Sequence, residues 1–241
     1  KRLQMPFFFD MERKFSIALR SAARQGKIPI IVDVKAYSPK EGDLFRGRTY
    51  SELALTFKNA GVPALAVITE KEHFQGSLEA LSRVAVVSGL PVLRKDFITE
   101  VKELEDTVQA GASAILLICS MHSPKRLKKL FLAAHELGLE VLVETHTAQE
   151  LETAAALGAK LIGINNKDIG KLELDDGTVF QSLTLIGQAP KDALVVSESG
   201  IHTRADVCAV MDAGADALLI GTALLQADDP AEYYKVLSIG R

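Results

Sequence analysis

Eight short apolar runs recur along the chain, and each ends in a polar or glycine-rich cluster. Segments with apolar residues at three- and four-residue spacing, typical of amphipathic helices, separate the runs. Strands of a parallel sheet that is covered on both faces read as continuous Val, Ile and Leu runs. Eight such strands alternating with helices predict an α/β fold, a closed (β/α)8 TIM barrel. The runs are IPIIVDV (28–34), PALAVI (63–68), PVLRK (91–95), SAILLI (113–118), EVLVET (140–145), KLIGIN (160–165), ALVVSE (193–198) and ALLIG (217–221).

The length of the chain and the pattern before the first run predict the domain organisation. A chain of 241 residues suits one barrel, which typically takes about 250 residues. Residues 10–25 have the spacing of an extra amphipathic helix before the first strand. We therefore predict an N-terminal helical extension over residues 1–29 that packs on the barrel, and the barrel itself over residues 30–241, as a single domain overall.

Composition and charge exclude several classes of partner. The 28 basic residues do not outnumber the 31 acidic ones, so the chain lacks the basic excess that nucleic-acid backbones require. No apolar run approaches the ~20 residues that span a bilayer, which argues against a membrane partner. The two cysteines, Cys119 and Cys208, form neither a disulfide framework nor a metal-ligand spacing. We expect a cytoplasmic protein that is a monomer or a weak homo-oligomer.

Two lysines and two glutamates follow the odd-numbered strands. Side chains from alternate strands share a layer inside such a barrel, so these four are expected to converge at its mouth and to shift one another's proton affinities. A structural interpretation is an ion-pair layer that closes the barrel, but buried ion pairs add little net stability. The pattern therefore favours a catalytic cluster. Its members are Lys35, Lys95, Glu144 and Glu198, with Asp33, Asn165 and Lys167 on the same rim.

Small residues follow the last two strands, in the segments SESG (197–200) and IGTALL (220–225). In many barrels of this kind the loops at these positions bind a phosphate through backbone N–H groups. The alternative is that the glycines serve only as tight-turn residues. We predict a phosphate site, and its candidate residues are Ser199, Gly200, Gly221 and Thr222.

The remaining motifs give little support for a metal or a cofactor. None of the five histidines has a metal-ligand spacing. His146, two residues past Glu144, is interpreted as a loop residue, and the alternative is that it contacts and supports a catalytic residue. No GxGxxG follows a strand and no GxxxxGK[ST] occurs, so dinucleotides and nucleoside triphosphates lack their usual motifs. Phe74 and Phe97 follow the second and third strands, where they would form an aromatic wall beside a flat ring.

At these strand ends the chain resembles the indole-3-glycerol phosphate synthase family of tryptophan biosynthesis. The resemblance implies a (β/α)8 barrel that converts 1-(2-carboxyphenylamino)-1-deoxyribulose 5-phosphate into indole-3-glycerol phosphate, CO2 and water. It also implies a carbon–carbon lyase (a carboxy-lyase) that uses no metal or organic cofactor. The matching segments are VKAYSP (34–39), ITEKEHFQGS (68–77), LRKDFI (93–98), VLVETH (141–146), GINNKD (163–168) and VSESGIHT (196–203).

The resemblance also implies roles for the strand-end residues. Lys95 would be the acid at the ketone oxygen, and Glu144 would be the base. Lys35 would hold an anionic group and act as a second acid. Asp33 stands where the family usually has a glutamate, and Asn165 and Glu198 would orient hydroxyls and lysines.

The same resemblance implies the substrate contacts. Ser38 would help to position the carboxylate, and Phe74 and Phe97 would border the ring. Lys167 replaces the usual arginine of a carboxylate clamp. Two alternatives stay open: a related barrel lyase, isomerase or lysine Schiff-base aldolase acting on another phosphorylated acid or sugar, and a non-catalytic barrel that binds a phosphorylated metabolite.

Overall fold

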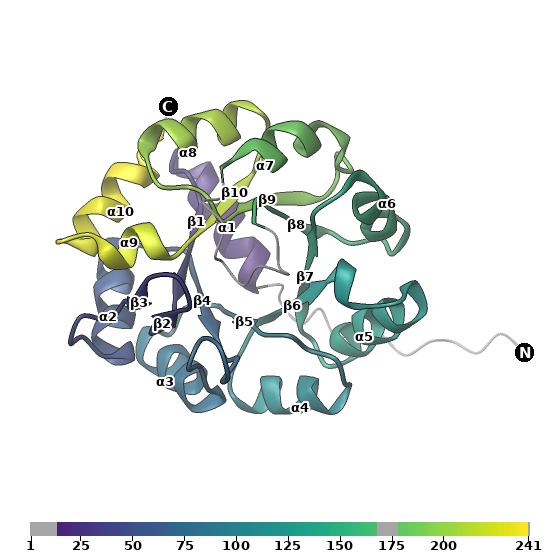
Figure 1. The fold of residues 1–241 in the computed structure, drawn as a ribbon, viewed down its shortest axis with the longest axis horizontal. Coiled ribbons are helices and arrows are strands. Elements are labelled where there is room, and N and C mark those ends of the chain that lie inside the picture. The colour runs from purple at the N-terminus through teal and green to yellow at the C-terminus, as the bar shows by residue number, and fades with distance from the viewer. Residues whose placement is uncertain (1–13, 168–177, 241) are drawn as a thin grey trace, which may run out of the picture.

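The eight predicted strands pair in parallel and close on themselves. The computed structural model describes residues 14–167 and 178–240, and within these ranges eight strands form a closed barrel in which β1 pairs with both β4 and β10 (Figure 1). This confirms the predicted fold class. The strands are β1 (Ile30–Val34), β4 (Ala64–Ile68), β5 (Val92–Lys95), β6 (Ala114–Ile118), β7 (Glu140–Thr145), β8 (Leu161–Asn165), β9 (Leu194–Glu198) and β10 (Ala217–Ile220).

Helices surround the barrel, and side-chain caps explain where several of them begin. Thr49 and Thr203 each form a reciprocal capping box, and Ser77, Ser123 and Thr147 each accept a backbone N–H of the first turn that follows. The helices are α2 (Tyr50–Ala60), α3 (Leu78–Ser88), α4 (Lys102–Gln109), α5 (Pro124–Glu136), α6 (Ala148–Ala156), α7 (Phe180–Leu185), α8 (Arg204–Asp212), α9 (Thr222–Gln226) and α10 (Pro230–Ser238). Short 3-10 turns lie at η1 (Cys119–Met121) and η3 (Ile186–Gln188), and a small hairpin, β2 (Tyr37–Ser38) with β3 (Gly42–Asp43), follows β1.

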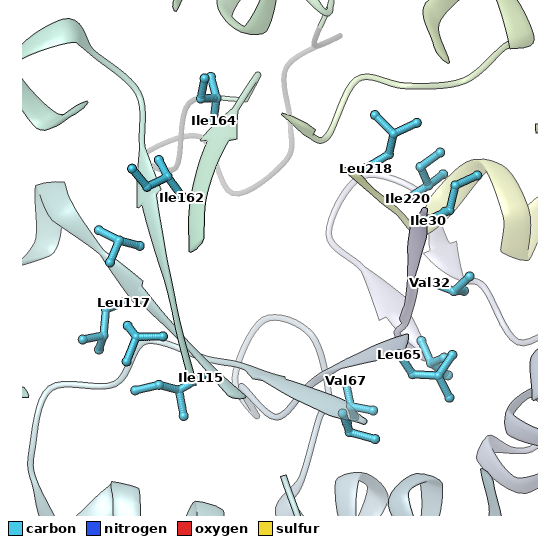
Figure 2. Close-up of a cluster of buried hydrophobic side chains, with 14 of the residues drawn as sticks. Ile30, Val32, Leu65, Val67, Ile115, Leu117, Ile162, Ile164, Leu218 and Ile220 are labelled. Carbon is cyan, nitrogen blue, oxygen red and sulfur yellow. The ribbon is translucent and has the colours of Figure 1, made fainter. Parts of the chain in front are cut away.

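Alternate residues of each strand face opposite sides of the barrel wall. One set, which includes Val32 and Val67, points outward beneath the helices (Figure 2). The other set fills the barrel interior, where Ile31, Leu93 and Leu142 are fully buried. This alternation decides which strand-end residues face the barrel axis.

A further helix, α1 (Lys14–Arg24), precedes the barrel. Its Phe15 and Leu19 are fully buried in the interior cluster together with Leu161 and Leu194 from the starts of β8 and β9. The helix therefore covers the amino-terminal end of the barrel, opposite the strand ends that carry the polar side chains. The start predicted at residue 10 lies outside the described residues, so the division into 1–29 and 30–241 stays a prediction. Within the described ranges, no helix combines the length and the apolar character that crossing a bilayer requires.

Candidate active site

The alternation along the strands brings the predicted charged residues to one end of the barrel interior. Lys95 lies two residues beyond Leu93, and Glu144 lies two residues beyond Leu142, so each continues an inward-facing series. Pairing between β8 and β9 sets Asn165 directly beside Glu198. Among these residues Glu144 and Glu198 are the most deeply buried. Asp33, Lys35, Glu144, Asn165 and Glu198 are all buried.

Glu144 is a buried carboxylate in which one oxygen accepts a hydrogen bond and the other has no hydrogen-bond partner among the described residues. Its Oε1 accepts a hydrogen bond of 3.0 Å from Asn165 Nδ2 and lies 3.3 Å from His146 Nε2. Its Oε2 has no hydrogen-bond partner among the described residues. Burial alone would raise the pKa of Glu144, but His146, the Lys95 charge and the Asn165 amide outweigh it and lower the pKa below its ordinary value. Glu144 is therefore ionised at neutral pH and suited to accept a proton.

Glu198 differs from Glu144 in its hydrogen bonding and in the direction of its pKa shift. It is fully buried, and neither carboxyl oxygen has a hydrogen-bond partner in the part of the chain that the structure describes. Burial, and then the charge of Glu144, raise the pKa of Glu198 to about 8, although the Lys95 charge acts in the other direction. Two carboxyl groups with separated pKa values are the arrangement that divides acid and base roles within one site.

A pocket with an empty volume of about 410 Å³, its open mouth included, lies at the strand ends and is lined by Lys95, whose charge acts on both glutamates. Cations and small residues line the same pocket, and this pairing suits an anionic ligand. The pocket brings together eight of the predicted site residues, within the described part of the chain. They are Asp33, Lys35, Lys95, Lys167, Ser199, Gly200, Gly221 and Thr222.

The loop after β9 has a left-handed backbone at two consecutive residues, Ser199 (φ 63°) and Gly200 (φ 67°). A serine rarely adopts this conformation, and the side chain of Asn166 holds it in place. Asn166 Nδ2 donates to the carbonyl oxygens of Glu198 (2.9 Å) and Ser199 (3.0 Å), while its Oδ1 accepts from the backbone N–H of Ser182 (2.9 Å). The sequence motif GINNKD contains Asn166, but only the structure assigns it this clamping function.

The remaining predicted residues lie outside the pocket. Of the described residues, Glu144, Asn165 and Glu198 do not line it, but the Lys95 charge acts on both glutamates. Ser38, Phe74 and Phe97 do not line it either. Ser38 is buried in β2, Phe74 is buried in the loop after β4, and Phe97 packs against the interior cluster beyond β5. The structure therefore does not group these three with the cationic pocket.

For His146 the structure favours the alternative, a contact with Glu144, over the interpretation as a plain loop residue. Its ring lies within ion-pair distance of Glu144, as described above, and its side chain is only 14% exposed. The position two residues past a strand-end glutamate was visible in the sequence, but the direction of the ring was not.

One group of possible metal ligands lies in the described residues: Glu70, Glu72 and His73 in the loop after β4. The Glu70 carboxylate already accepts the backbone N–H groups of residues 72, 73 and 74, so the loop uses it as an internal cap. These hydrogen bonds explain why the three side chains lie close together without a metal ion.

The fold and the pocket define a (β/α)8-barrel protein with a cationic, carboxylate-bearing site at the carboxyl ends of its strands. Residues 7–237 match the family model described as indole-3-glycerol phosphate synthase. The chain belongs to the indole-3-glycerol phosphate synthase family. It is 45% identical over 216 residues to the protein of that name from Pyrococcus furiosus, covering 90% of this chain and 94% of the relative. It is 44% identical over 218 residues to the one from Thermococcus kodakarensis, covering 90% and 95%.

Solved structures of more distant proteins share the fold alone. A mandelate oxidase mutant superposes with a TM-score of 0.67 at 17% identity, covering 94% of this chain and 84% of that one. Orotidine 5′-phosphate decarboxylase from Pyrococcus horikoshii superposes with a TM-score of 0.64 at 13% identity, covering 86% and 96%.

Proposed function

We propose that this protein is an indole-3-glycerol phosphate synthase, a carboxy-lyase that acts on 1-(2-carboxyphenylamino)-1-deoxyribulose 5-phosphate. The main support for this proposal is the position of Lys95. It lines the cationic pocket, and its charge acts on both Glu144 and Glu198. An ammonium group and an ionised carboxylate in one site supply the acid and the base that this reaction needs.

The substrate has two anionic ends, and the pocket offers groups for both. In this proposal the phosphate binds at Ser199, Gly200, Gly221 and Thr222. The substrate carboxylate lies toward Lys35 and Lys167, and Ser38 would help to position it. Phe74 and Phe97 would border the aromatic ring after a movement of their loops.

Ring closure comes first in the proposed mechanism. The aromatic carbon that carries the carboxylate attacks the ketone carbon, and Lys95 gives its proton to the ketone oxygen, which becomes a hydroxyl. Loss of CO2 from the same ring carbon then makes the ring aromatic again. A neutral Glu198 and Asn165 orient the hydroxyl groups during these steps.

Dehydration completes the reaction. Glu144 removes the proton from the ring nitrogen while the hydroxyl leaves as water, with its proton supplied by Lys35. The CH2 group next to nitrogen then loses a proton and the nitrogen regains one, which gives the aromatic indole. Asp33 lines the same pocket and would hold the ammonium group of Lys35 in place. The small phosphorylated substrate is the only partner in this proposal, which needs no cofactor, nucleic acid or membrane. We further propose a cytoplasmic enzyme that is a monomer or a weak homo-oligomer.

A direct assay tests the proposal. The purified chain is mixed with the synthase substrate, and formation of the indole product is followed by fluorescence. The chain contains no tryptophan, so the background in this assay is low. Turnover is expected, and its complete absence at high enzyme concentration would refute the proposal.

Two controls separate the alternatives. Borohydride treatment in the presence of substrate traps a covalent adduct on Lys95 or Lys35 only if the enzyme works as a Schiff-base aldolase. A binding protein would show thermal stabilisation by phosphate without turnover. We expect turnover with no trapped adduct.

A further inference from the structure

The ring of His146 lies between two carboxylates from different elements. His146 follows the last residue of β7, and its Nε2 is 3.3 Å from Oε1 of Glu144. Its Nδ1 is 3.4 Å from Oε2 of Glu150, in the first turn of α6. The exposed fractions of the side chains are 1% for Glu144, 14% for His146 and 21% for Glu150. The imidazole therefore connects a fully buried carboxylate to one that reaches solvent.

The backbone around His146 is held on both sides. Its N–H donates to Glu150 Oε2 (2.6 Å), and the Thr147 hydroxyl caps α6 by accepting the N–H of Glu150 (3.2 Å). Its carbonyl oxygen accepts a hydrogen bond from the side-chain amide of Gln181 in α7. With three elements fixing this loop, the ring has a defined place beside Glu144.

We propose that His146 is a positioning residue for Glu144: as an imidazolium it holds Oε1 and keeps the carboxylate ionised, so that Oε2 is the oxygen that takes the substrate proton. This inference rests on the proposed function. The two oxygens of Glu144 differ in the way the inference requires. Asn165 and His146 flank Oε1, whereas Oε2 has no hydrogen-bond partner among the described residues.

The carboxylates around the ring support an imidazolium, whereas the more distant Lys95 cation opposes it. Glu144 in β7 and Glu150 in α6 face the ring, while Glu198 in β9 and Lys95 in β5 act at longer range. Burial alone would lower the pKa of His146, but the two facing carboxylates outweigh it and raise the pKa above its ordinary value. The positive charge of the imidazolium in turn favours the ionised form of Glu144.

The mechanism gives this second cation a purpose. Lys95 gives up its proton during ring closure, so its charge is absent until it is reprotonated. His146 takes no part in that transfer and keeps its charge throughout. Glu144 therefore stays ionised for the dehydration step even while Lys95 is neutral.

Activity profiles of two variants test the inference. In His146→Gln the acidic limb of the kcat/KM–pH profile should move up by about one pH unit, because a cation within a few ångströms shifts a carboxyl pKa by about that much or more. kcat should fall while KM changes little. In Glu150→Gln the imidazole stays but protonates less readily, so the limb should move in the same direction by a smaller amount.

His135→Gln is the matched control, because His135 is an exposed histidine of α5 whose ring nitrogen lies near its own helix's Phe131 carbonyl. Its profile should equal that of the unmodified protein. An unchanged acidic limb in His146→Gln would overturn the inference.

An NMR titration of the unmodified chain needs neither turnover nor a folded variant at position 146. The imidazole of His146 should titrate above its ordinary value of about 6.5, and the midpoint should fall in Glu150→Gln. A midpoint at or below the ordinary value would overturn the inference even in an active enzyme. If the midpoint is raised but the chain shows no turnover, the imidazolium–carboxylate pair is supported, and only the proposed synthase function is contradicted.

Discussion

Gly163 in β8 makes room for the carboxyl group of Glu198 in β9. A Cβ atom at position 163 would overlap Oε1 of Glu198 and lie 3.1 Å from its Cδ. Glu198 is fully buried, so its carboxyl group would have to shift within the packed interior. The missing side chain at one strand thus determines where the carboxyl group of the next strand lies.

Gly163→Ala should therefore damage the site as well as the packing. Overfilling a packed interior costs about 1–3 kcal/mol, and the displaced Glu198 should lower kcat. Urea unfolding and steady-state kinetics measure the two effects. Gly187→Ala is the control, because a Cβ at Gly187 meets nothing within 4 Å. Equal behaviour of the two variants would show that Gly163 does not set the position of Glu198.

The raised pKa of Glu198 predicts a pH dependence of stability. Its carboxyl titrates at about 8 in the folded chain, against an ordinary value of 4.5. The folded state thus holds a proton that the unfolded state has lost, so this stabilisation is complete below about pH 4.5 and is lost as pH rises through 8.

Glu198→Gln removes that titration while keeping the shape of the neutral carboxyl group. The variant's free energy of unfolding, measured in urea from pH 5 to pH 9, should decline less than that of the unmodified chain. Glu105→Gln, at an exposed position of α4, should follow the unmodified chain. A constant difference between Glu198→Gln and the unmodified chain at all pH values would contradict the raised pKa.

The sequence predicted the convergence of Lys95, Glu144 and Glu198 because that convergence depends only on strand alternation and closure of the barrel. Strand alternation and barrel closure both follow from the apolar pattern of the sequence. The contact of His146 with Glu144 could not be predicted in this way, because the direction of the ring depends on Glu150, a residue of the following helix. Asn166 is a similar case, since its amide contacts a carbonyl oxygen 33 residues later in the chain.

Lys95→Ala tests the acid of the proposed reaction. Loss of a general acid typically lowers the rate by about 10²–10⁴-fold, and KM should rise only modestly because the other pocket lysines remain. Steady-state kinetics by indole fluorescence give both constants. Lys102→Ala, at an exposed position of α4, should leave them unchanged. Undiminished kcat in Lys95→Ala would remove this residue from the chemistry.

Lys167→Arg tests the carboxylate clamp. Lys167 lines the pocket, and its backbone N–H donates to Asn165 Oδ1 (3.0 Å), which fixes the start of its side chain. A guanidinium can grip a carboxylate with two parallel hydrogen bonds, whereas an ammonium cannot. KM should fall by about fivefold, which corresponds to about 1 kcal/mol, with little change in kcat. Lys160→Arg, at the other end of β8, is the control, and an equal KM in both variants would exclude Lys167 from the clamp.

Glu140 at the start of β7 ties α1 to the barrel. Its Oε1 accepts the backbone N–H groups of Phe15 (2.8 Å) and Ser16 (3.0 Å), near the start of that helix. A carboxylate at this position satisfies donors that a helix leaves open and complements the helix dipole. The same contact keeps Phe15 seated in the barrel interior, where it is fully buried.

Glu140→Gln should therefore loosen α1 without changing the chemistry at the other end of the barrel. The free energy of unfolding should fall by about 1–2 kcal/mol, since the charged acceptor becomes a neutral amide oxygen that forms weaker hydrogen bonds. Trypsin should cleave faster at Arg20 and Arg24, which are exposed residues of α1. Glu136→Gln, at the exposed end of α5, should behave as the unmodified chain. Unaltered stability and cleavage in Glu140→Gln, measured by urea unfolding and timed proteolysis, would mean that burial of Phe15 and Leu19 alone holds the helix in place.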